Sequence, residues 1–273
     1  MSVQAEVSAS WRAYRHLIGA SVRAQMQFRT SLFMQMVASC ALTATNFIEV
    51  LVIFDHLPML GNWSAVEVAF LYGASGIGFG LCDMAIGSIE RTGELVRTGK
   101  FDSIMLRPVG TLVSIAGSDM ALRRVGGIAQ AALVFVVASA RVGIEFNVRN
   151  VVLIVVMIFG GTAIFAAVFL ATAAIQFWMV GANEIGNALT YGGNYLTSFP
   201  LPVFSGWLRR LLAYVVPLAF CAYLPALAIL NKPDELGIPA FLRYASPAVA
   251  AIVFLAAYGF WRLGVRHYRS TGS

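Results

Sequence analysis

The 273-residue sequence contains little charge: Asp, Glu, Lys and Arg make up 12% of it, whereas hydrophobic residues make up 59%. Soluble chains are about one quarter charged and about half apolar. A soluble core cannot bury so large an apolar excess, but a bilayer can, at about 20 uncharged residues per spanning helix. The composition therefore excludes an ordinary soluble domain and predicts an all-α, polytopic membrane protein with about six spans.

Cysteine and histidine are also scarce. Cys40, Cys82 and Cys221 lie in apolar stretches without CxxC or Cys/His spacing, which indicates neither a disulfide framework nor a metal site. Residues 73–76 match the Gly-x-Ser-Gly string of intramembrane serine proteases, but Ser75 would need a histidine base. All three histidines of the chain lie outside the apolar runs. We therefore expect no catalytic residue and no bound metal.

Motifs for nucleotides and nucleic acids are missing as well. Residues 93–100, GELVRTGK, resemble a phosphate-binding loop but have one residue too many before Gly-Lys, and Phe101 stands where Ser or Thr should bind magnesium. The 19 basic residues outnumber the 13 acidic ones, yet they fall at the ends of apolar runs rather than in a dense tract. No nucleic-acid partner is expected, and any ATP dependence must come from another polypeptide. The polar and basic first 30 residues also lack the features of a cleaved signal peptide.

Six apolar runs predict the spans of a single transmembrane domain over residues 32–273. They cover residues 32–54, 65–88, a stretch ending near 140, 151–180, 184–204 and 241–261. The fourth run is about 45 Å long as a helix, against a bilayer core of about 30 Å, so it should tilt, protrude or bend at Gly160-Gly161. The fifth is less apolar and ends at Pro200 and Pro202, where a helix should break.

The segment 206–230 decides the topology, because it is apolar but contains Pro217 and Pro225. If it enters and leaves on the same side, both termini share a side that carries 13 basic residues, against six on the other. The positive-inside rule then places both termini in the cytoplasm. If it spans instead, a seventh crossing results and the bias becomes weaker. We prefer the re-entrant alternative, which requires a protein or water environment for its backbone.

Polar residues within the runs are candidates for function. Glu49, Glu67 and Asp83 lie near span ends, where a solvated or helix-paired role competes with that of an ion or proton relay. Gly76 and Gly80 form a GxxxG pattern that favours close helix contact. A polar stripe recurs every three to four residues along the fifth run: Asn183, Asn187, Thr190/Tyr191, Asn194 and Thr197/Ser198. It is typical either of interhelical hydrogen bonding or of the wall of a hydrated path.

Two amphipathic segments lie outside the spans. Residues 89–108 mix charges of both signs with apolar side chains, and residues 11–29 mix basic and aromatic residues. Each could be an interfacial helix on the inner leaflet. The first could also be the docking surface of a soluble partner. We expect residues 1–31 to form a cytoplasmic interfacial helix and residues 89–124 a cytoplasmic segment that couples to such a partner.

These features together resemble the ABC-2 type exporter permeases, and the resemblance covers nearly the whole chain. They are the basic N-terminal helix, the first helical hairpin, the string RTGKFDSIMLRP at residues 97–108, and the proline-containing segment before the last span. The Gly-x-hydrophobic-Asp string followed by Leu-Arg-Pro is the most specific of them. It is especially similar to the branch associated with antibiotic and multidrug export. The segment 206–230 departs from the family pattern and has its own sequence.

The resemblance implies a half-transporter of the inner membrane that binds no cofactor itself. A dimer of ABC ATPase subunits would hold ATP and Mg, and a second permease, identical or homologous, would complete the pore. Coupling to the ATPase would involve Glu90, Arg91, Glu94, Arg97, Lys100, Phe101, Asp102, Leu106 and Arg107. Spans two and five would line the translocation path through Gly76, Gly80, Asn187, Tyr191, Asn194 and Ser198. The alternative function is an ion- or proton-coupled secondary transporter, which would use an acidic residue in a broken helix within the membrane.

Overall fold

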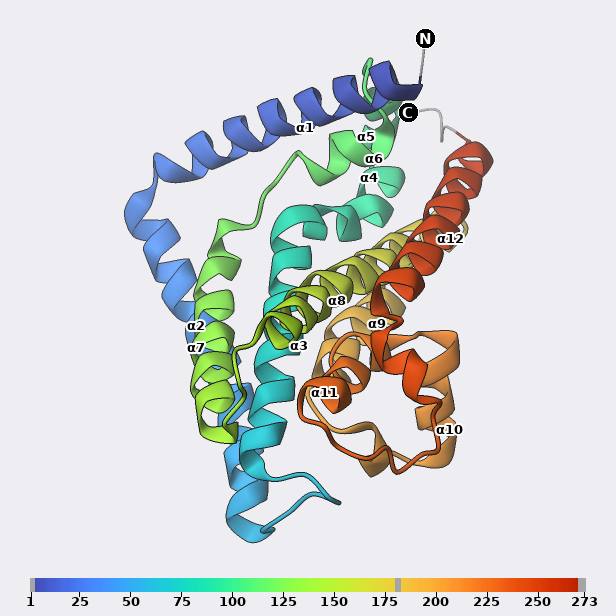
Figure 1. The fold of residues 1–273 in the computed structure, drawn as a ribbon. Coiled ribbons are helices and arrows are strands. Elements are labelled where there is room, and N and C mark those ends of the chain that lie inside the picture. Colours follow the sequence, from blue (N-terminus) through green and yellow to red (C-terminus); the bar gives the residue numbers. More distant parts are fainter. Residues whose placement is uncertain (1–2, 180–182, 270–273) are drawn as a thin grey trace.

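The structure is a computed structural model that describes residues 3–179 and 183–269, and within these ranges every regular element is helical (Figure 1). Five of the helices are long and apolar enough to cross a membrane. They are α2 (Arg29–His56), α3 (Ala65–Ile86), α7 (Val125–Val142), α8 (Val148–Ile175) and α12 (Ser246–His267). The prediction of an all-α polytopic membrane protein is therefore confirmed.

The bundle is centred on α3 and α8. Helix α8 packs against α12 on one side and α3 on the other, while α7 lies along α3 and α2 lies along α7. In the most apolar stretch of α3, 61% of the residues are buried, compared with 11% in α2. Helix α2 is thus peripheral, and most of its apolar surface faces outward from the chain.

Small residues allow α3 and α7 to approach closely. A Cβ atom added at Gly73 would lie 2.6 Å from Cβ of Phe135, and one added at Gly80 would lie 2.5 Å from Cγ1 of Ile128. At Gly76 the nearest atom would be Cβ of Ala131, at 2.9 Å. The GxxxG pattern of Gly76 and Gly80 therefore packs within this chain, against α7.

Helix α8 is continuous, so the alternative of a bend at Gly160-Gly161 is not observed. Instead, the glycine pair allows Cys221 and Ser246 to pack closely against α8. An added Cβ at Gly161 would lie 3.1 Å from the carbonyl oxygen of Cys221, and one at Gly160 would lie 3.3 Å from Cβ of Ser246. The 28 residues of α8 extend about 42 Å, which exceeds a bilayer core of about 30 Å.

The fifth run forms a shorter helix than predicted. Helix α9 (Asn183–Thr197) has 15 residues, about 22 Å, and ends before Pro200. After a short turn, Gly206–Val215 and Leu218–Ile229 form a pair bent by 73°, the geometry of a broken span or a re-entrant loop. This pair contains α10 (Gly206–Arg210) and α11 (Tyr223–Ile229), which Figure 1 places away from the two marked ends of the chain. Every residue of α11 is buried.

Short helices near both marked ends of the chain make up a separate module (Figure 1). After α3, the chain continues through η1 (Gly87–Arg91) into three helices of six residues each. They are α4 (Thr92–Arg97), α5 (Lys100–Met105) and α6 (Thr111–Ala116). Gly99 joins α4 to α5 at φ 68°, a left-handed conformation that favours glycine. The long helix α1 (Val3–Met26) lies against α6.

Candidate functional site

Six of the nine predicted coupling residues are exposed in the module formed by α4–α6. Leu106 is the most exposed of them, at 87%, although it is apolar. The other five are charged: Arg91, Glu94, Arg97, Lys100 and Arg107. Met105, beside Leu106, is 41% exposed. The module thus presents basic and apolar side chains together, a composition suited to binding another protein.

The remaining three predicted coupling residues face inward. Phe101 is fully buried, with its ring centroid 5.1 Å from that of Phe177 and 4.9 Å from that of Tyr268. Asp102 lies beside the Tyr268 hydroxyl. The pKa of Tyr268 is raised mainly by burial and, to a smaller extent, by the Asp102 carboxylate. These contacts join α5 to the ends of α8 and α12. Phe101 can therefore affect a partner only through the position of α5.

Glu90 also points into the protein, towards α9. Its carboxylate accepts hydrogen bonds from the hydroxyls of Thr190 and Tyr191, each at 3.2 Å. The exposed Arg91, one residue later, points the other way. Glu90 and Arg91 therefore lie on opposite sides of η1, one against α9 and the other on the protein surface.

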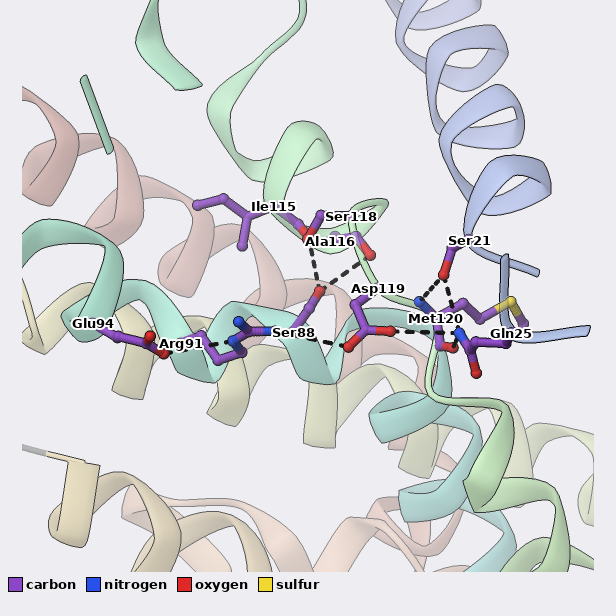
Figure 2. A network of polar contacts seen from close by, with 10 residues as sticks. All are labelled: Ser21, Gln25, Ser88, Arg91, Glu94, Ile115, Ala116, Ser118, Asp119 and Met120. Carbon is purple, nitrogen blue, oxygen red and sulfur yellow. Dashed lines mark hydrogen bonds and ion pairs between the residues drawn. The ribbon is translucent and has the colours of Figure 1, made fainter. Parts of the chain in front are cut away.

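A polar network ties α1 to the module (Figure 2). The side-chain amide of Gln25 donates to the carbonyl of Met120 at 2.6 Å, and the Met120 amide donates to the Ser21 hydroxyl at 3.1 Å. Beside them, Asp119 lies 3.8 Å from the guanidinium of Arg91. The N-terminal helix and the start of α4 are thus linked through the loop at Asp119 and Met120.

Three further hydrogen bonds hold η1 against α6 and α4 against the end of α8. Ser88 donates to the carbonyls of Ile115 at 2.8 Å and Ala116 at 3.2 Å, which holds η1 against α6 (Figure 2). The backbone amide of Gly93 donates to the side-chain carbonyl of Gln176, just after α8. Because these donors and acceptors are buried, breaking either contact would leave polar groups unsatisfied. The module should move together with α3 and α8.

A cavity of about 390 Å³ lies between α2, α3, α7 and α9. Five of the six predicted path residues line it: Gly76, Gly80, Tyr191, Asn194 and Ser198. The sixth, Asn187, is exposed and does not line it. The volume lies within the range of about 300–1,000 Å³ found for ligand pockets.

The polar stripe on α9 both packs and lines this cavity. Ser75 of α3 donates to Asn194 at 3.2 Å and shares a hydrogen bond with Thr197. Thr190 and Thr197 are buried, whereas Tyr191 and Asn194 reach the cavity. One helix face therefore makes hydrogen bonds to α3 and also contributes to the wall of the cavity. The side chain of Asn183 lies outside the described residues.

A cluster of charged side chains closes the cavity near the module. Asp83 of α3 and Arg124 form an ion pair with 2.6 Å between Oδ2 and Nε. Arg124 also donates to the Tyr191 hydroxyl at 2.9 Å, and Tyr191 in turn donates to Glu90. Sequence reasoning assigned no functional role to Arg124. The available signal in the sequence was the pair Arg123-Arg124 directly before an apolar stretch. This pair did not indicate that Asp83 would be the partner of Arg124.

At the other end of α3, the turn between α2 and α3 contacts the loop after α11. Lys232 forms an ion pair with Glu67 at 2.6 Å, donates to the carbonyl of Asn62 at 2.7 Å, and lies 4.9 Å from the centroid of the Trp63 ring. Glu67 also completes a capping box with Ser64 at the start of α3. Glu67 therefore has a helix-paired role, one of the two alternatives drawn from the sequence.

Apolar spans around a cavity, with a module of exposed charges at one end, define a multi-pass membrane protein. The family model described as ABC-2 family transporter protein matches residues 40–272. The chain therefore belongs to the ABC-2 transporter family, as the permease subunit of an ABC transporter and a multi-pass membrane protein. The family implies association with an ABC ATPase. A search of the curated proteins and a search of the solved structures each gave no match.

Proposed function

We propose that this permease is the membrane subunit of an ATP-driven exporter of the inner membrane. A separate ATPase, which holds ATP and Mg, would power the exchange between inward- and outward-open states. A bound nucleotide shifts such states only if it interacts differently with them. The observation that carries the proposal is the module of α4–α6, which exposes Arg97, Lys100 and Leu106 while Gln176 and Phe177 hold it against α8.

The path would follow the cavity between α3 and α9. Its inner end lies at Arg124 and Tyr191, and its outer end lies towards Val50 of α2. Closure of the ATPase dimer would push the module and, through Gly93 and Gln176, the inner end of α8. Opening of the inner end then requires the bond between Arg124 and Tyr191 to break.

A second permease, identical or homologous, would complete the transporter. Helix α2 supports this proposal, because its apolar side chains Phe33 and Met34, which lie outside the cavity, are 66% and 67% exposed within the chain. The remaining apolar surface would contact lipid. Both termini would lie in the cytoplasm together with α4–α6, as the distribution of basic residues indicates. The bent pair at 206–229 would be re-entrant from the outer side.

The alternative, an ion- or proton-coupled secondary transporter, would use the buried acidic residues at the end of α3. Asp83 is paired with Arg124, and Glu90 is held by two hydroxyl groups. The module would then have no partner to couple to, so we favour the ATP-driven mechanism.

The test is reconstitution of the permease in proteoliposomes with and without its partner ABC ATPase. We expect the two proteins to copurify, and solute movement to require both of them and ATP. Substitution of the catalytic glutamate of that ATPase, which blocks hydrolysis, is the matched control. Solute flux by the permease alone, driven by a proton or sodium gradient, would instead establish the secondary transporter.

A further inference from the structure

The shape of the cavity is elongated along α2. Lining residues on one face of this helix run from Gln35, near its inner end, to Val50. This distance corresponds to about 22 Å at 1.5 Å per residue. The opposite wall is formed by residues of α3, α7 and α9. A narrow, extended solute suits this shape better than a compact one.

The charge of the lining is all of one sign. Among the described residues, the only charged ones in the lining are Arg123 and Arg124, at the inner end, and no Asp or Glu lines the cavity. Arg124 is already bound by Asp83 and Tyr191. Arg123 makes no hydrogen bond or ion pair in the part of the chain that the structure describes, although its charge acts on the nearby Asp83 carboxylate. One guanidinium thus remains available at the inner end of the cavity.

The rest of the wall is neutral and mostly apolar. Leu42, Phe79 and Ile128 supply apolar surface, and Asn46 and Asn194 supply amides. Towards the outer end, the Tyr195 hydroxyl donates to Glu49 at 2.7 Å, so a carboxylate lies behind that part of the wall. An anionic group is therefore favoured at the inner end and disfavoured at the outer end.

We propose that the cavity binds an amphipathic anion, with its acidic head at Arg123 and its apolar body along α2 towards Val50. This inference rests on the proposed function, because it names the class of solute that the exporter would move. A guanidinium binds carboxylate, sulfonate and phosphate heads through paired N–H donors, so the shared chemistry is the anionic head. The apolar body gains by leaving water for the wall of the cavity.

Binding is measured on the permease alone, in nanodiscs of neutral phosphatidylcholine, with radiolabelled decanoate as the probe. Decanol and decyltrimethylammonium, which share its chain but not its charge, serve as competitors. We expect decanoate to bind saturably, and the two competitors to displace it at least about tenfold less well than unlabelled decanoate. Equal or better displacement by the cation would overturn the proposal.

Three variants locate the site. Arg123→Gln should weaken decanoate binding about tenfold, the effect of losing one charge-assisted hydrogen bond, while Arg123→Lys should restore part of it. Ala38→Phe fills the cavity from an exposed position of α2 and should reduce binding of decanoate and decanol alike. Arg141→Gln, at the other end of α7 and outside the cavity, is the control and should bind as the wild type does.

Unchanged binding in both Arg123→Gln and Ala38→Phe would mean that decanoate dissolves in the bilayer or binds elsewhere, and the inference would be wrong. Because this assay contains no ATPase, its outcome is independent of coupling. ATP-driven transport of a cationic solute, with no decanoate binding, would refute the solute class and leave the proposed function intact. Decanoate binding to the permease, combined with no ATP-dependent transport in proteoliposomes that contain the ATPase, would refute the proposed function and leave the solute class intact.

Discussion

Asp83 and Arg124 form an ion pair inside the helix bundle, with 2.6 Å between Oδ2 of the carboxylate and Nε of the guanidinium. The Asp83 side chain is only 4% exposed, and that of Arg124 is 27% exposed. Because Arg124 also bonds to Tyr191, the pair joins α3, the start of α7 and α9 at the end of the cavity nearest to α4–α6. Movement of α9 away from α3 must therefore disrupt this group of side chains.

Arg124→Gln should destabilise the protein by about 3 kcal/mol, because it leaves the Asp83 carboxylate buried without its cation. The double variant Asp83→Asn/Arg124→Gln should recover much of this loss, since no uncompensated charge remains. Thermal unfolding in nanodiscs, followed by tryptophan fluorescence, measures both effects. Additive losses in the double variant would show that the two groups do not interact.

Gly80→Ala should destabilise the contact between α3 and α7 by about 1–3 kcal/mol, because the added Cβ would lie 2.5 Å from Cγ1 of Ile128. In an Ile128→Ala background the same substitution should cost much less. Gly259→Ala, in α12, has no neighbouring atom within 4 Å of the added Cβ and is the matched control. Thermal unfolding again gives the comparison, and equal effects at the two glycines would contradict the packing argument.

Asn194→Leu should alter which solutes stimulate the partner ATPase, because Asn194 lines the cavity. The fold should persist, since Ser75 keeps its bond to Thr197. Asn187→Leu, an equivalent change on the exposed side of α9, should leave the response to solutes unchanged. ATPase assays with a panel of amphipathic solutes test the pair, with the yield of assembled complex as the control. Identical responses of both variants and the wild type would leave Asn194 as a packing residue.

Charge reversal at Arg97 or Lys100 should uncouple ATP hydrolysis from transport while the protein still inserts. Both side chains are exposed on the module, so the change should repel the partner without disturbing the core. Copurification of the ATPase and solute-stimulated hydrolysis are the measurements, with Arg141→Glu at the opposite end of α7 as the control. Normal copurification and stimulation in both reversed variants would count against docking at the module.

The sequence predicted the long spans well because each is set by an uninterrupted apolar run between polar or charged residues. The charge-free run at 151–180 gave α8, and Pro58 and Gly61 marked the turn between α2 and α3. The run at 184–204 was read as a full span, yet α9 has 15 residues. Polar side chains of its stripe form hydrogen bonds with α3, and the helix ends before Pro200.

The site was predicted less completely, because its geometry depends on contacts between distant parts of the chain. Helical periodicity placed Tyr191 and Asn194 on one face, but it could not show that Asn187 lies outside the cavity. The inward direction of Glu90 and Phe101 depends on how η1 and α5 dock on α9, α8 and α12. No local pattern in the sequence encodes the pairing of Asp83 with Arg124.

The length of α8 has a consequence for the lipid in which the protein works. A helix longer than the hydrocarbon core adapts to membrane thickness by tilting. The C-terminal end of α8 leads into Gln176, which holds the Gly93 amide at the start of α4. A change in acyl-chain length is thus expected to shift the surface that meets the ATPase, so bilayer composition itself becomes a means of adjusting the coupling.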